Sequence, residues 1–154
     1  MKILLPFLFL LGSLTVSELI SKNPSFGYLT QTQKTQPSRI NLSGIWEGDY
    51  TCNQGQTRLK LDLRIDSLER VKAIFYFSAH PHNPSIPSGS FEMQGFYRRL
   101  DSGRAWLSLG GTRWINQPSG YEMVGLSGIV FLDEQRIIGD VVYPGCKNFN
   151  LRRM

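Results

Sequence analysis

The chain lacks the motifs that mark the common classes of enzyme. It contains no Walker loop for nucleotide phosphates and no glycine-rich dinucleotide fingerprint. Residues 125–128, GLSG, do not form a G-x-S-x-G nucleophile elbow, and no helical pattern follows them. Glu47 and Asp49 share one face of a predicted strand, whereas a glycosidase needs two carboxyl groups that face each other across the substrate. We therefore predict a protein that is not an enzyme and that uses no cofactor.

The chain has only two histidines, and it shows no recognisable nucleic-acid-binding motif. His80 and His82 have the H-x-H spacing that can present two imidazoles on one side of a strand. A zinc site needs a third and usually a fourth ligand, and Pro81 interrupts regular strand geometry between the two histidines. His80 and His82 are thus weak candidates for a metal site, and positions in a surface loop are the alternative. No nucleic-acid partner is predicted.

No apolar run reaches the about 20 residues that span a bilayer core. Residues 3–16, ILLPFLFLLGSLTV, have instead the length of the apolar region of a signal peptide, and they follow the positive charge of Lys2. The small residues Thr15 and Ser17 predict cleavage near Ser17, and an uncleaved anchor is the alternative. Residues 1–17 therefore predict export, with a secreted or periplasmic mature protein.

Cysteine is also scarce, because the whole chain contains only Cys52 and Cys146. An even pair in an exported chain predicts a disulfide bond. The two residues are 94 positions apart, and closing a loop of about 100 residues contributes up to about 4.7 kcal/mol in the chain-entropy view. We expect this bond to join the two ends of the folded domain.

Residues 18–41 show no sustained period of two or of 3.6 residues, and they are rich in Gln, Thr, Ser and Pro. This composition predicts a disordered polar tether. Residues 42–154 then form one domain. The net charge of the chain is +5, which favours anionic partners such as cell-wall polymers or phospholipid headgroups, and a solvated basic surface is the alternative.

Within the domain, apolar residues recur at every second position. In residues 57–65, TRLKLDLRI, four aliphatic side chains alternate with charged ones, and residues 71–78, VKAIFYFS, return in the same register after a turn. Similar runs occupy residues 45–52, 90–98, 104–110, 122–132, 136–143 and 149–152.

About seven to nine short strands without a convincing helix predict an all-β domain. A small antiparallel β-barrel is favoured over a β-sandwich, because an end-to-end disulfide would help to close a sheet on itself. Four glycines lie inside these strands and predict sharp bends or bulges: Gly95, Gly125, Gly128 and Gly139.

Two stretches interrupt the tight turns and are the expected loops, and loops on a rigid sheet are where binding sites concentrate. One is residues 79–89, AHPHNPSIPSG. The other is residues 111–121, GTRWINQPSGY, which combines aromatic rings with amides and a guanidinium group that can grip sugars or peptides. Alternatively, Trp114 folds back and caps the barrel. The candidate ligand-binding residues are Arg113, Trp114, Asn116, Gln117, Tyr121 and Trp106.

The motifs GIWEGDYTCNQG, RWINQPSGY, VGLSG and PGCKNFNLRR together resemble an uncharacterised bacterial family that is frequent in cyanobacteria. Its members occur alone after a signal peptide or are appended to caspase-like peptidase domains. The resemblance covers most of residues 43–153 and brings no established activity. It implies an accessory extracytoplasmic domain.

A second resemblance is to the membrane-bound lysozyme inhibitor family. Tyr50-Thr51-Cys52, the late Cys146 and Ser119-Gly120-Tyr121 are similar to that family, whose fold is an eight-stranded barrel with a bridging disulfide. There a Ser-Gly loop enters the lysozyme cleft. The Trp-Ile-Asn-Gln-Pro run before Ser119 and the missing lipoprotein cysteine depart from its pattern.

These observations together predict a non-catalytic extracytoplasmic binding or accessory module. Its expected partner is a cell-envelope component, such as a glycan, a peptide or another small ligand, or a secreted protein. The alternative is an inhibitor of lysozyme or of another secreted hydrolase.

Overall fold

The computed structural model describes residues 40–154 and confirms the all-β prediction. The predicted signal peptide and all but the last two residues of the predicted tether lie outside the described residues. The strands are β1 (Gly44–Cys52), β2 (Gly55–Ile65), β3 (Arg70–Ser78), β4 (Gly89–Arg99), β5 (Arg104–Asn116), β6 (Gly125–Phe131), β7 (Arg136–Val142) and β8 (Asn148–Arg153).

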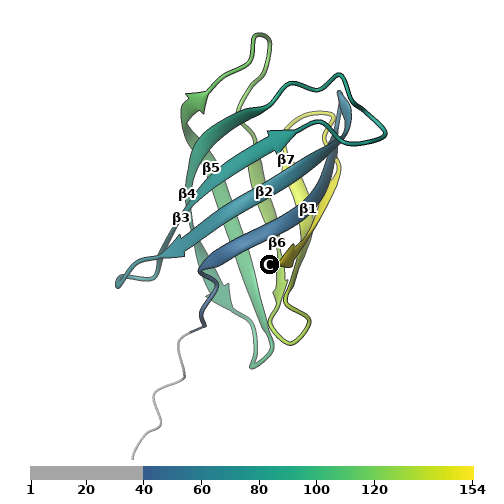
Figure 1. The fold of residues 1–154 in the computed structure, drawn as a ribbon. Coiled ribbons are helices and arrows are strands. Elements are labelled where there is room, and N and C mark those ends of the chain that lie inside the picture. Colours follow the sequence, from purple (N-terminus) through teal and green to yellow (C-terminus); the bar gives the residue numbers. More distant parts are fainter. Residues whose placement is uncertain (1–39) are drawn as a thin grey trace, which may run out of the picture. The chain divides into compact units, whose positions relative to one another are not determined.

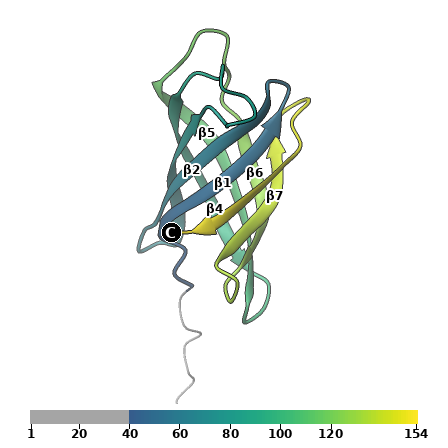
Figure 2. The same cartoon turned by 45° about the vertical axis from the view of Figure 1, so that its right-hand side comes forward.

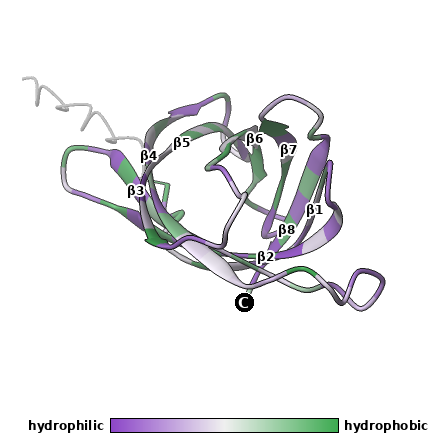
Figure 3. Cartoon of the chain, turned by 90° about the horizontal axis from the view of Figure 1, so that it is seen from above, coloured by the Kyte–Doolittle hydropathy of each residue, from purple (hydrophilic) through white to green (hydrophobic). Residues whose placement is uncertain are grey.

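The eight strands form a closed barrel in which each strand pairs with its neighbours in sequence. All pairs are antiparallel, and β1 pairs with β8 to close the sheet from Trp46–Arg153 to Tyr50–Phe149. Figures 1 and 2 show the strands tilted around a common axis, and Figure 3 shows the ring that they make from above. The prediction of a barrel rather than a sandwich is confirmed, and closure leaves the sheet without an open edge.

The period of two in the sequence produces the core directly. Leu59, Leu61 and Leu63 of β2 are at most 2% exposed, whereas the intervening side chains lie on the outer wall. Opposite them across the β2–β3 ladder lie Phe77 and Phe75, which are also buried. The interior of the barrel is therefore packed with aliphatic and aromatic side chains, and burial of this apolar surface is its main stabilising contribution.

The predicted disulfide between Cys52 and Cys146 is present. Cys52 is the last residue of β1, and Cys146 lies in the loop between β7 and β8. Beside the bond, the backbone N–H of Lys147 donates to the carbonyl of Thr51 at 2.8 Å. The covalent link thus holds together the first strand and the last hairpin, as expected for a bond that joins the two ends of the domain.

The prediction that residues 111–121 form a loop is wrong for residues 111–116. Residues 111–116 are not part of a loop, because β5 continues through them to Asn116. Met93 pairs with Gly111 and Glu92 with Arg113, so Thr112 is an extra residue in β5. Phe91 pairs with Trp114 and Ser90 with Asn116, so Ile115 is a second extra residue. A β-bulge reverses the faces of the residues that follow it, and Trp114 therefore points into the barrel.

The bulges predicted at the four strand glycines lie elsewhere. The register shifts are in the β4–β5 pair, at Ser90/Phe91 and Glu92/Met93. The glycines mark close approaches of neighbouring strands. A Cβ at Gly95 would lie 1.9 Å from the carbonyl oxygen of Ser108, and one at Gly139 would lie 2.1 Å from that of Ser127. Any side chain at these positions would force the strands apart.

One end of the barrel is closed by the segment that precedes β1. Leu42 is fully buried, and Ile40 is buried beside it although it was predicted to belong to the tether. The indole N–H of Trp46 donates to the carbonyl of Leu42 at 3.0 Å. The guanidinium of Arg153 lies 5.4 Å from the centre of the Trp46 ring and donates to backbone carbonyls of Asn41 and Ser43. We call this the closed end.

Candidate functional site

The opposite end of the barrel, which we call the mouth, is surrounded by the turn at residues 53–54 and by the loops at residues 79–88, 117–124 and 143–147. A pocket of about 370 Å³ opens there, a size within the range of small-molecule sites. Its lining combines aromatic rings, amides and the disulfide, and its residues are Tyr50, Cys52, Asn53, Gln54, Phe75, Phe77, Phe91, Gly120, Tyr121, Glu122, Val124, Tyr143 and Cys146.

The floor of the mouth pocket is aromatic. The rings of Phe75 and Phe91 are stacked with centroids 4.6 Å apart, and Tyr50 meets Phe75 edge-on at 5.4 Å. These three side chains are at most 4% exposed. Inward positions on β1, β3 and β4 supply these rings, so they form the apolar base of the pocket. The half-buried Tyr121 above them is the ring that a ligand can reach.

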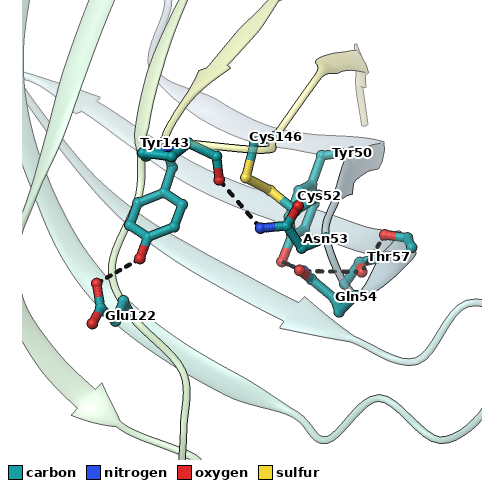
Figure 4. The surroundings of a disulfide bond; sticks show 10 residues. Tyr50, Cys52, Asn53, Gln54, Thr57, Glu122, Tyr143 and Cys146 are labelled. Atoms are coloured by element: carbon teal, nitrogen blue, oxygen red, sulfur yellow. Dashed lines mark hydrogen bonds between the residues drawn. A yellow bond between two sulfur atoms is a disulfide. The ribbon is translucent and has the colours of Figure 1, made fainter.

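One wall of the pocket is polar. The side-chain amide of Gln54 donates to the hydroxyl oxygen of Tyr50 at 3.1 Å and to the hydroxyl of Thr57 at 3.4 Å (Figure 4). Burial raises the pKa of Tyr50 to about 12, although the hydrogen bonds from Thr57 and Gln54 act in the opposite direction. The phenol is therefore neutral at physiological pH and remains available as a hydrogen-bond donor.

The rim is held by two contacts between loops. The hydroxyl of Tyr143 donates to the Glu122 carboxylate at 2.7 Å, and the side-chain amide of Asn53 donates to the carbonyl of Pro144 at 3.2 Å (Figure 4). The bond to Glu122 raises the pKa of Tyr143, because it stabilises the neutral phenol. Glu122 is the one charged residue among the described residues that line this pocket. An uncharged or cationic ligand is thus favoured over an anion.

Tyr121 is brought over the pocket by the turn that precedes it. Its backbone N–H bonds to the carbonyl of Pro118 at 3.3 Å, and Gly120 has φ = 78°, which suits the third position of a type II turn. The Tyr121 ring then stacks on Phe77 at 5.3 Å. The Gln117 amide donates to the Tyr121 carbonyl at 3.1 Å, so Gln117 supports the loop.

The neighbouring candidates Arg113 and Trp114 lie on opposite faces of β5. Arg113 is exposed on the outer wall and makes two bonds to the carboxylate of Glu92, at 2.5 and 3.2 Å. Trp114 is half-buried and packs edge-on against Phe91 at 5.1 Å. Trp114 packs against the aromatic floor and is not among the residues that line the pocket.

Asn116 and Trp106 lie on the outer wall, away from the mouth pocket. The Asn116 amide donates to the carbonyl of Ser88 at 3.2 Å. The Trp106 indole donates to Ser127 at 3.2 Å and meets Phe96 edge-on at 5.4 Å. Of the six predicted ligand-binding residues, the structure therefore places only Tyr121 in the pocket.

The histidines occupy the other long loop. The Nδ1 atom of His80 accepts the backbone N–H of His82 at 3.1 Å, and its Nε2 atom lies 3.6 Å from the Asp49 carboxylate. His80 is buried, whereas His82 is exposed. Within residues 40–154 no group of three or more His, Cys, Asp or Glu side chains could hold a metal ion. Glu47 and Asp49 both lie on the outer wall.

Sequence reasoning missed most of the pocket. Tyr50 and Phe75 could have been found from the alternation in their strands, which already placed them on the buried face. Glu122 and Tyr143 gave no local signal, because they come from different loops and meet only when the barrel closes. The pocket is a product of topology more than of any motif.

No protein-family model matches the chain, and no curated protein matches it. The disulfide indicates an oxidising, extracytoplasmic environment. Residues 40–154 include no helix that is long and apolar enough to cross a membrane.

Proposed function

We propose that this protein is a non-catalytic binding module of the extracytoplasmic space, secreted or periplasmic, and that its mouth pocket takes a ring of a cell-envelope glycan or peptide. One observation carries the proposal: a rigid aromatic floor lies beneath a rim of amide and hydroxyl groups, in a pocket without Arg, Lys or His. Sugar and aromatic rings stack on an accessible ring such as that of Tyr121 above this floor, and their polar groups bond to amides and phenols.

The titratable groups support binding rather than catalysis. An ordinary phenol is already protonated at neutral pH, and the pKa values of Tyr50 and Tyr143 are raised further by burial and by the bond to Glu122, so neither phenol acts as a base. The His80–Asp49 pair lies outside the mouth pocket. General acid–base catalysis needs a group whose pKa is near the working pH and within reach of the substrate, and the two phenols do not meet that condition.

A matched pair of aromatic variants tests the proposal. Tyr121→Ala removes a ring of the pocket, whereas Trp106→Ala removes a ring of the outer wall. With purified peptidoglycan in co-sedimentation and with the N-acetylglucosamine disaccharide in calorimetry, the wild type and Trp106→Ala should bind. Tyr121→Ala should bind about fivefold more weakly, since stacking of one ring contributes roughly 1 kcal/mol.

Two results would contradict the proposal. The first is that neither probe binds the wild type, and the second is that Trp106→Ala weakens binding as much as Tyr121→Ala does. Circular dichroism of both variants establishes that they are folded.

The tip of the loop at residues 117–124 favours a second candidate, an inhibitor of lysozyme or of another secreted hydrolase. Ser119 and Gly120 are exposed, and no atom lies within 4 Å of the position that a Cβ on Gly120 would occupy. The tip is thus free to enter a cleft. An equimolar amount of the protein should abolish lysozyme activity, and full activity in the presence of excess protein excludes lysozyme as the target.

A further inference from the structure

A second concave site lies on the outer wall, and Phe77, which is buried in the barrel interior, is the one described lining residue that it shares with the mouth pocket. The site has a volume of about 430 Å³ and crosses five strands. One row of paired residues runs along it: Glu47 with Lys60, Lys60 with Tyr76, Tyr76 with Ser90, and Ser90 with Asn116. Arg58 and Ser78 form a neighbouring pair nearer the mouth. We call this site the outer groove.

The outer groove carries excess positive charge. Arg58 and Lys60 are both exposed and line the groove, and Glu47 is the one acidic residue among its described lining residues. Five other arginines of residues 40–154 form ion pairs with Asp or Glu, whereas neither Arg58 nor Lys60 takes part in any of the six pairs found there. The charges of these two residues are therefore available to a ligand.

The arrangement of the neighbours explains why Arg58 lacks a partner among the described residues. Asp49 faces it across the β1–β2 ladder, but the Asp49 carboxylate approaches His80 at 3.6 Å. The loop that carries His80 is fixed to the first hairpin, because the Asn83 amide donates to the Gln54 carbonyl at 2.6 Å. Asp49 thus lies against this pinned loop rather than in an ion pair with Arg58, and its buried Oδ1 atom accepts no hydrogen bond from the described residues.

Lys60 is positioned as well as charged. Its Nζ atom lies 4.5 Å from the centre of the Tyr76 ring, a cation–π contact that restricts the long side chain. The ammonium group is consequently held over the middle of the groove, where a carboxylate can bond to it.

The remaining groups of the groove are hydrogen-bonding ones. Three serines, Ser78, Ser88 and Ser90, line it together with Asn116. The Asn116 N–H group is used by Ser88, which leaves the Asn116 carbonyl as an acceptor. The apolar lining residues Leu59 and Phe77 are at most 4% exposed and belong to the barrel interior. The surface suits a hydrated polar chain and offers little to lipid tails or to apolar peptide side chains.

We propose that the outer groove binds an acidic oligosaccharide, with a sugar carboxylate on Arg58 and Lys60 and sugar hydroxyls along the serine row. Charge-assisted bonds from both cations fix the carboxylate, and the hydroxyls and the Asn116 carbonyl select a carbohydrate. The mouth pocket, which lacks cations, is not required for this binding.

The test uses three probes of matched length: trigalacturonate, the uncharged maltotriose, and triglutamate, which has carboxylates but no sugar. Calorimetry at about 0.15 M salt should detect trigalacturonate with the wild type and much weaker binding of the other two. Arg58→Gln and Lys60→Gln should each weaken trigalacturonate binding about tenfold, since a hydrogen bond to a charged group contributes roughly 1.5 kcal/mol or more.

Lys72→Gln is the control variant. Lys72 is exposed on the same outer wall of β3, and removing it changes the net charge as Lys60→Gln does, but it lies outside the groove. It should change the affinity less than about twofold, because exposed charges at a distance are screened by salt. Equal losses for Lys72→Gln and Lys60→Gln would show diffuse attraction and overturn the proposal.

Three further results would overturn the proposal: trigalacturonate fails to bind the wild type, maltotriose binds equally well, or triglutamate binds equally well. Tyr121→Ala separates this site from the mouth pocket, because it should leave trigalacturonate binding unchanged.

Discussion

The two ends of this barrel are made from the same strands and differ in almost every other respect. At the closed end, three short turns and the segment at residues 40–43 cover the core, and Trp46 is 1% exposed. At the mouth, the turn at residues 53–54 and three longer loops surround a pocket of about 370 Å³. An eight-stranded barrel has an interior that side chains can just fill, so the loops decide where it stays open.

In this fold, the contacts that stabilise the barrel and the residues that can bind a ligand lie at different ends. Closed-end contacts engage the backbone: the N–H of Met154 bonds to the Ile45 carbonyl at 3.0 Å, and the Ser43 hydroxyl accepts the N–H of Ile65 at 3.0 Å. Mouth contacts join loops through exposed side chains such as Glu122 and Tyr143. Substitutions at the closed end should therefore lower the stability of the fold more than substitutions at the mouth do.

The largest effect is expected from Trp46→Ala. Removing a fully buried Trp should lower the free energy of unfolding by about 3–5 kcal/mol. Tyr121→Ala at the mouth removes one stacked pair and should cost about 1 kcal/mol. Urea unfolding of both variants, each with its disulfide intact, measures the two changes. Similar losses of unfolding free energy in the two variants would contradict this difference between the closed end and the mouth.

A smaller effect is expected at the mouth at high pH. The pKa of Tyr50 is about 12 in the folded protein and 10.0 without burial, so the unfolded chain loses this proton first. The contribution of Tyr50 to the free energy of unfolding should be fully present below pH 10. It should be lost as the pH rises through 12, by about 3 kcal/mol in all for two pKa units.

Tyr50→Phe should remove this part of the alkaline loss, which unfolding curves at pH 9 and pH 11.5 would reveal. Tyr76→Phe is the control, because Tyr76 lies on the outer wall and does not line the mouth pocket. An unchanged alkaline loss in Tyr50→Phe would mean that Tyr50 is not the group responsible.

The smallest effect concerns two turns of the closed end. Bonds from Arg70 lower the pKa of Asp66, and bonds from Arg104 lower the pKa of Asp101. Both carboxylates therefore contribute stability that is present above pH 3.8 and is lost as the pH falls through their folded pKa values.

Both groups are exposed, so we expect only a slight decrease in melting temperature at neutral pH for Asp66→Asn and Asp101→Asn. The difference from wild type should shrink in acid, which thermal unfolding at pH 7 and pH 2.5 measures. A difference that grows in acid would contradict this assignment.

The barrel itself could be predicted from the sequence because alternation encodes it locally. Residues 57–65 alone specify which side chains face inward, and burial of Leu59, Leu61 and Leu63 follows. The pairing of Cys52 with Cys146 needed only the count of cysteines and the expected export.

The site could not be predicted in the same way. The bulge at Thr112 reverses the faces of β5, and no residue type there announces an extra residue in the ladder. Trp114 was therefore expected in a recognition loop, although it lies in β5 and packs against Phe91 of the floor. Tyr50 and Tyr143 are separated by most of the domain and line one pocket because β1 closes against β8.

The pairing of β1 with β8 also brings the first and last described residues to one pole of the barrel. Arg153 bonds to Asn41 and Ser43, and Figure 2 shows the C-terminus beside the start of β1. A support, a label or a fused domain attached at Met154 is thus placed at the pole opposite the mouth. Immobilised through that terminus, the protein presents its mouth to the solution, which is the orientation that a capture assay requires.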